Sequence, residues 1–335
     1  MKSHFFGIVV SLIGAAAALQ AQANPDTLVV TASNATQNQL LVYNPSGKLL
    51  QTISTQGKGG VSGNAGGIET RDGLVAVVNF GSKSVSVFER LGSGLQMIES
   101  VPTVSSPVSV AFGNDHLYIL GTTKVESHLI FGNHVDSNPD GVVGLLVADG
   151  SAAQVGVVPN QLVITEKSNV IENVALRSDG SVNGSATLVQ NIPSNVNTPF
   201  GLVTRGNDAY VTIAHANEIS LVRNGAILTI TGSGTQMAPC WLTLVGPFLF
   251  SSNSPSMSVS RYAVYGQKIV QDAAVAASQN GDPTDIASGE GLVAVIDGSG
   301  KLTIYNIDED GNLTTQGSAS ISTVANGVAV IPSAF

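Results

Sequence analysis

Short apolar runs alternate with turn residues along the whole chain, and the runs recur at a nearly constant interval. A small residue or proline precedes each aliphatic strand start, and a second apolar strand begins nine or ten residues later, as in LVAVVN at 74–79 and LVAVID at 292–297. Each interval of 40 to 47 residues holds four short strands and lacks a 3.6-residue hydrophobic period, which favours a β-propeller over helical repeats. The repeated position falls at Ala65, Pro107, Ala152, Pro199, Pro239, Pro283 and Ala325.

The two ends of the chain each supply part of one repeat. One interval before Ala65 lies position 23, so the first repeat lacks an inner strand and begins with the strand at 28–31. The last anchor, Ala325, is followed by a single strand at 327–331. The pattern therefore predicts an all-β fold, a seven-bladed β-propeller with four-stranded blades, in which the C-terminal strand completes the N-terminal blade.

The first 23 residues have the pattern of a secretory signal. Lys2 supplies a positive start, residues 5–19 an apolar stretch, and Ala21-Gln22-Ala23 a cleavage site between small residues. We expect residues 24–335 to form one secreted propeller domain. An uncleaved anchor is the alternative, but about 15 apolar residues fall short of the roughly 20 that span a bilayer. No later segment is long and apolar enough, so no membrane span is expected.

Composition narrows the classes of partner. Only 11% of residues are charged and the formal net charge is −9, so nucleic acid and anionic membranes would be repelled. We expect a monomer. Cys240 is the only cysteine, which rules out a disulfide within the chain. Acceptor sequons at Asn34, Asn183 and Asn312 would make the protein a glycoprotein in a eukaryotic source.

A propeller brings certain loops together around its central channel. The loops that lead into inner strands and those that leave second strands open on the same face, so their residues are candidates for a site at the channel mouth. The residues at these positions are Gln154, Cys240, Trp241 and Asp285, and Asn34, Asn79, Glu166, His215, Asn253 and Asp297.

Four segments carry a family resemblance. AAQVGVVPNQLVITEKSNVI at 152–171, TPFGLV at 198–203, APCWLTL at 238–244 and DPTDIAS at 282–288 resemble the lactonase-like seven-bladed propeller family, most of all its secreted branch. Its better-known members are similar to sugar-acid lactonases and to the fungal enzyme that cyclises carboxymuconate.

That resemblance implies a reaction without a metal, carried out by Glu, Arg and His at the channel mouth. It places the glutamate on Glu166. The Arg-His pair falls on Ala153 and Gln154, which cannot carry a positive charge, and this departs from what a densely anionic substrate needs.

Each candidate has a chemical and a structural interpretation. Glu166 follows an apolar strand, where burial would suit it to acid or base catalysis, or it accepts backbone hydrogen bonds. His215 is the second catalytic candidate as a proton shuttle, or an exposed loop histidine. Cys240 is a nucleophile or inert packing. The candidates for substrate binding are Gln154, Asn79, Trp241, Asn253, Asp285 and Asp297.

No metal and no cofactor are expected. His116, His128 and His134 share one repeat but lack compact ligand spacing. Residues 136–141 match the opening of a calcium loop, but the twelfth position is Val147 in place of Glu, so we interpret them as a polar turn.

Two functions remain open. One is a hydrolase or cycloisomerase that opens, closes or isomerises a small lactone-type ring at the channel mouth. The alternative is a non-catalytic secreted propeller that binds a protein, a glycan or a cell-wall component.

Overall fold

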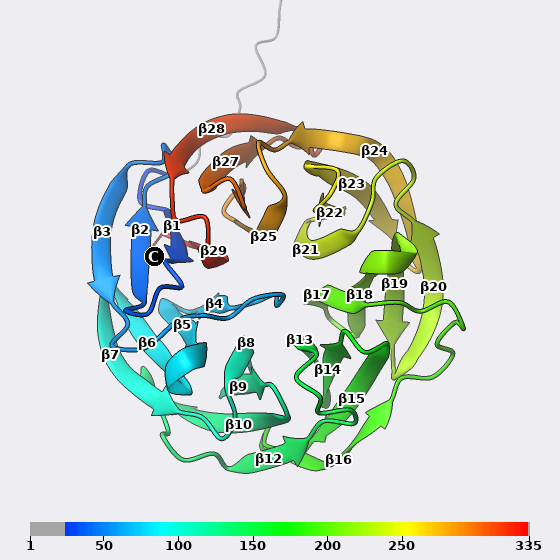
Figure 1. Ribbon diagram of the computed structural model, residues 1–335, viewed down its shortest axis with the longest axis horizontal. Helices are drawn as coiled ribbons and strands as arrows, with labels where there is room; N and C mark the ends of the chain where they lie inside the picture. Colours follow the sequence, from blue (N-terminus) through cyan, green and yellow to red (C-terminus); the bar gives the residue numbers. More distant parts are fainter. Residues whose placement is uncertain (1–23, 334–335) are drawn as a thin grey trace, which may run out of the picture.

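Seven antiparallel sheets surround a central axis like the blades of a propeller (Figure 1). The computed structural model describes residues 24–333, so the signal peptide predicted at 1–23 lies outside the described residues. Across this range no helix has the length and apolar character required to cross a bilayer. The all-β, seven-bladed prediction is confirmed.

Each blade runs from an inner strand at the axis to an outer strand at the rim. Blade 1 consists of β29 (Asn326–Ile331), β1 (Leu28–Ala32), β2 (Gln39–Tyr43) and β3 (Leu49–Ser54). Blade 2 consists of β4 (Ile68–Arg71), β5 (Leu74–Asn79), β6 (Ser84–Leu91) and β7 (Gly94–Pro102). Blade 3 consists of β8 (Pro107–Gly113), β9 (His116–Gly121), β10 (Lys124–Phe131), β11 (His134–Val135) and β12 (Gly141–Gly144). Blades 4 and 5 consist of β13 (Ala152–Val158), β14 (Gln161–Glu166), β15 (Val170–Leu176) and β16 (Val182–Leu188); and β17 (Pro199–Arg205), β18 (Asp208–Ile213), β19 (Glu218–Arg223) and β20 (Ala226–Gly232). Blades 6 and 7 consist of β21 (Pro239–Val245), β22 (Phe248–Asn253), β23 (Ser258–Tyr265) and β24 (Lys268–Ser278); and β25 (Pro283–Gly289), β26 (Leu292–Asp297), β27 (Lys301–Ile307) and β28 (Leu313–Ser320). Two single-turn 3₁₀ helices, η1 (Phe80–Ser82) and η2 (Ala214–Ala216), follow β5 and β18.

The C-terminal strand completes the N-terminal blade, as predicted. β29 pairs antiparallel with β1, in a register that sets Leu28 opposite Ile331 and Val30 opposite Ala329. The Thr31 hydroxyl donates to the carbonyl of Gly327 at 2.7 Å, within the buried part of this pairing. The seam between the chain ends is therefore closed by ordinary sheet hydrogen bonds.

The second strands are the most deeply buried part of each blade. All six residues of β5, β9, β18 and β26 are buried. Because neighbouring blades cover both faces of these strands, they read as continuous apolar runs, whereas the outer strands alternate between exposed and covered residues. Five predicted anchors, from Pro107 to Pro283, are the first residues of inner strands, as expected.

Blade 3 departs from the regular pattern at its rim. Its outer position is shared by β11 and β12, both paired with β10, and residues 136–140 form a turn between them. Asp140 accepts hydrogen bonds from Ser127 Oγ at 2.5 Å and pairs with His116 Nε2 at 2.7 Å. The acidic segment is thus a polar turn tied to its own blade.

Ring closure gives a direct test. A chain that ends at Ala325 should lose about 5 kcal/mol or more of unfolding free energy, because buried Val328, Val330 and Ile331 contribute about 1.5–3 kcal/mol each. Thermal unfolding followed by circular dichroism measures the loss. A chain ending at Ser333 is the control and should match the full sequence; equal unfolding midpoints for all three chains would contradict the closure.

Candidate functional site

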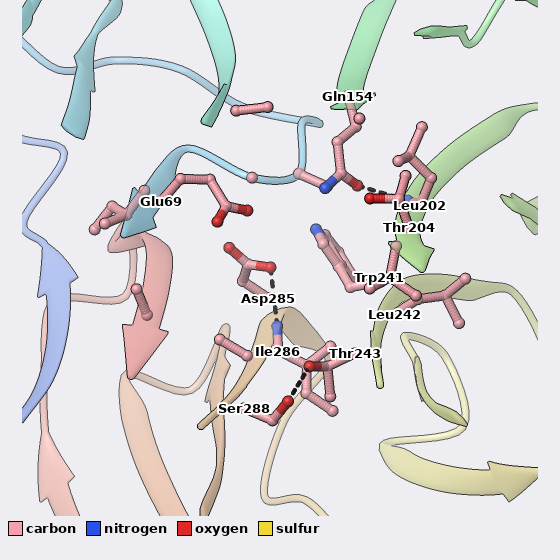
Figure 2. Close-up of a pocket in the computed structure, with 18 of the residues that line it drawn as sticks. Glu69, Gln154, Leu202, Thr204, Trp241, Leu242, Thr243, Asp285, Ile286 and Ser288 are labelled. Carbon is pink, nitrogen blue, oxygen red and sulfur yellow. Dashed lines mark hydrogen bonds between the residues drawn. The ribbon is translucent and has the colours of Figure 1, made fainter. Parts of the chain in front are cut away.

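The inner strands of all seven blades line one cavity on the propeller axis. Its volume is about 380 Å³, within the range of small-molecule sites (about 300–1,000 Å³). Figure 2 shows side chains from several strands projecting into it. Much of the wall is aliphatic, and among the described residues that line it none is Lys, Arg or His. The polar lining residues are Glu69, Thr70, Gln154, Thr204, Thr243, Asp285 and Ser288.

Two carboxyl groups face each other in this cavity. Glu69 projects from β4 and Asp285 from β25, the two inner strands that pack on either side of β29 (Figure 2). The main-chain N–H groups of Ile286 and Val328 donate to separate oxygens of Asp285, at 2.9 and 3.2 Å. Asp285 is therefore held by its own strand and by β29, the strand that closes the ring.

The pKa values of both carboxyl groups are raised well above their ordinary values. Burial raises the pKa of Asp285 to about 8; the two main-chain hydrogen bonds act in the opposite direction, and the charge of Glu69 raises it further. Burial likewise raises the pKa of Glu69 to about 7, against a hydrogen bond from Thr70 N–H. Glu69 keeps some exposed area, but that area faces the cavity and not open solvent. Near neutral pH the pair thus carries about one proton.

Neutral hydrogen-bonding groups surround the carboxyl pair. Thr243 Oγ1 and Ser288 Oγ lie 2.6 Å apart and share a hydrogen bond. Gln154 Oε1 accepts the N–H of Leu202 at 2.6 Å, which leaves its Nε2 without a partner among residues 24–333. The cavity therefore offers hydroxyl groups and one amide donor to a ligand.

One end of the channel is covered. The segment before β4 crosses it: Trp241 Nε1 donates to the carbonyl of Asn64 at 2.9 Å, and Ala65 N–H donates to Ala153 O at 3.1 Å. Phe200 packs edge-on against Trp241, with ring centroids 5.2 Å apart. The sequence analysis predicts an open channel mouth at this end. The structure differs because residues 61–65 occupy the space there.

The opposite end of the cavity is more open. There the inner strands finish, and in six of the seven the last cavity-lining residue is half-buried, whereas Val330 of β29 and the lining residues near the strand starts are buried. The half-buried residues are Thr70, Phe112, Val157, Thr204, Leu244 and Ser288.

Three of the predicted site residues line the cavity, namely Gln154, Trp241 and Asp285. Glu166 does not. It is fully buried at the end of β14, where its two oxygens accept the N–H groups of Val147 and Ala148 at 3.0 and 3.1 Å. This is the structural interpretation given for it above.

The other residues that end second strands also lie outside the cavity lining. Asn79 accepts hydrogen bonds from Asn38 and Thr55 and donates to Ser86, so its amide is used within the fold. Asn253 donates to Ser258 and Ser260 at 3.1 and 2.8 Å.

Asp297 caps the turn after β26, where its Oδ1 accepts the N–H and hydroxyl of Ser299. His215 lies in η2, is exposed, and its Nδ1 shares a hydrogen bond with the hydroxyl of Thr198 at 2.8 Å. Cys240 is absent from the cavity wall, and burial raises the pKa of its thiol to about 12, which makes the thiolate scarce.

Glu69 is the site residue that sequence analysis missed. It is displaced from the expected entry position because β4 begins only at Ile68, after Gly66 and Gly67. A usable signal was present, since IETR places a carboxyl in a short inner strand whose counterparts in other blades are mainly apolar.

The residues of 24–333 contain no group of three or more His, Cys, Asp or Glu side chains arranged to hold a metal ion. Glu69 and Asp285 are thus a pair without a third such ligand.

Comparison with known proteins gives similarity at the level of the fold. No protein-family model and no curated protein matches the sequence. Among solved structures, a candidate 6-phosphogluconolactonase from Bacteroides fragilis is 13% identical, with a TM-score of 0.66 over 92% of this chain and 98% of its own. A protein from Lactobacillus plantarum is 14% identical, with a TM-score of 0.68 over 91% and 99%. Virginiamycin B lyase from Staphylococcus aureus is 17% identical, with a TM-score of 0.57 over 82% and 92%. At these identities the chain is a propeller of similar architecture to all three.

Proposed function

We propose that this chain is a secreted, lactonase-like hydrolase or cycloisomerase that acts on a small lactone-type ring without a metal. The reaction takes place in the central cavity, with Glu69 and Asp285 as the acid–base pair. The observation that carries the proposal is that these two carboxyl groups face each other in a cavity of about 380 Å³ and have pKa values near neutrality.

The pair can divide the work of ring opening. Ionised Glu69 removes a proton from a water molecule as the water oxygen attacks the ring carbonyl carbon. Protonated Asp285 donates its proton to the ring oxygen as the carbon–oxygen bond breaks. The product is an open-chain hydroxy acid, and the reverse sequence closes the ring. Gln154 Nε2 and the Thr243–Ser288 hydroxyl pair line opposite sides of the cavity (Figure 2), so either one could supply a hydrogen-bond donor to the developing oxyanion.

Two further observations support this function. The fold resembles that of a candidate 6-phosphogluconolactonase, a name that denotes a lactone-hydrolysing enzyme. Residues 1–23 have the pattern of a secretory signal, which supports secretion. The reaction as written needs no cofactor.

A second function is favoured by a different surface. Exposed apolar side chains occur on loops that lead into several inner strands, on the face where the channel is covered. These residues are Val104, Leu146, Val147, Met237 and Val324. Such a face suits an extracellular protein or cell-wall partner, and the absence of turnover of every lactone by the folded protein would favour this function.

A lactone hydrolysis screen tests the proposed reaction. Glu69→Gln and Asp285→Asn should each lower kcat by about 10²–10⁴-fold, because one proton transfer is lost. Glu172→Gln is the matched control, because burial raises the pKa of Glu172 to about 7 as it does for Glu69. Glu172 lies on β15, outside the cavity wall, so the Glu172→Gln variant should keep the activity of the unaltered protein. If Glu166→Gln lost activity and Glu69→Gln kept it, the catalytic carboxyl would be Glu166 and the proposed role of Glu69 would be wrong.

The carboxyl pair also predicts how stability depends on pH. Both groups stay protonated in the folded chain at pH values where the unfolded carboxyls, with a pKa near 4, are ionised. The folded state binds more protons, so unfolding free energy should fall by a few kcal/mol as pH rises from about 4 to 8. Thermal unfolding midpoints at pH 5.5 and 8.5 measure this fall. The double variant Glu69→Gln/Asp285→Asn should show a smaller fall, with a remainder due to Glu172; an unchanged slope would contradict the shifted acidities.

A further inference from the structure

The cavity wall is unusual in its charge. Its two ionisable side chains are both acidic, and none of the described residues that line it is basic. Arg71 and Arg205 end inner strands near the open end, but neither lines the cavity. Arg71 pairs with Asp72 and Asp115, each at 3.2 Å, and Arg205 Nη1 donates to the carbonyl of Gly246 at 2.6 Å.

Another basic group, Lys167, lies on the covered side of the channel. Lys167 Nζ donates to the carbonyl of Gly63 and lies 6.0 Å from the centroid of the Phe200 ring. It is absent from the cavity lining, so it offers no counter-charge to a ligand inside.

We propose that the ligand of this cavity is an uncharged ring compound that carries hydroxyl groups, and that rings bearing phosphate or carboxylate are excluded. This inference rests on the proposed function and names the class of its substrate. An anionic group would enter a partly dehydrated space beside Glu69 and Asp285 and would find no cation to pair with.

The polar groups of the wall suit hydroxyl groups in particular. Thr70, Thr204, Thr243 and Ser288 can donate or accept, as sugar-like hydroxyls can, and the carboxyl oxygens accept hydrogen bonds from them. An ammonium group can only donate hydrogen bonds, so it cannot accept from Gln154 Nε2 or from the hydroxyl groups of the wall. The aliphatic and aromatic wall, with Leu202 and Trp241, can cover the carbon faces of a ring (Figure 2).

Binding of unreactive rings tests this inference separately from catalysis. Isothermal titration at pH 7 would compare 1,5-anhydroglucitol with its 6-phosphate and its 2-amino derivative. The neutral ring should bind at least about tenfold more tightly than the phosphate, because a like charge inside the cavity is costly. In Glu69→Gln/Asp285→Asn the difference between the two should shrink, whereas Glu172→Gln should keep it.

The outcomes separate the two proposals. Equal or tighter binding of the phosphate or the amine, or no binding of any of the three rings, overturns the inference about charge and hydroxyl groups. Binding of the neutral ring without hydrolysis of glucono-1,5-lactone supports the inference and counts against the proposed reaction. Hydrolysis that depends on Glu69, together with tight binding of the phosphate, supports the reaction and overturns the inference.

Discussion

Backbone pairing between β1 and β29 is the constraint on which the rest of this structure depends. It joins residues about 300 positions apart in sequence and gives the first blade the inner strand that the N-terminal segment lacks. The same strand also places the cavity, because β29 separates β4 from β25 and its Val328 N–H holds Asp285. Closure of the ring therefore also helps to fix the position of Asp285.

The properties of the carboxyl pair follow from where the ring puts it. The two carboxyl groups are buried among the inner strands, and neither has a basic partner in the cavity wall. Under these conditions binding a proton is the least costly way in free energy to remove the buried charge. The pKa values of both carboxyl groups are therefore raised toward neutral pH. A site of this kind needs no special sequence motif, only two acids on inner strands that meet at the axis.

The fold could be predicted from sequence because blade spacing and buried second strands leave a strong periodic signal. The candidate site could be predicted only in part. Asp285, Gln154 and Trp241 follow inner-strand anchors, and that position does face the axis. Asn79 and Glu166 end second strands, and there the side chain turns into the packed space within and between blades, where it caps loops. Repeat position alone does not distinguish these two directions, nor does it reveal that two glycines delay the start of β4.

The covered end of the channel limits how substrate and product can enter and leave the cavity. Because Trp241 and the 61–65 segment close one side, the cavity is a cup and not a tunnel. A molecule that enters past Thr204 and Ser288 must leave by the same route, so a product has to depart before the next substrate can arrive. The rate of turnover would then depend on how fast product and substrate exchange through the single opening. An unreactive ligand bound in the cavity would block turnover completely.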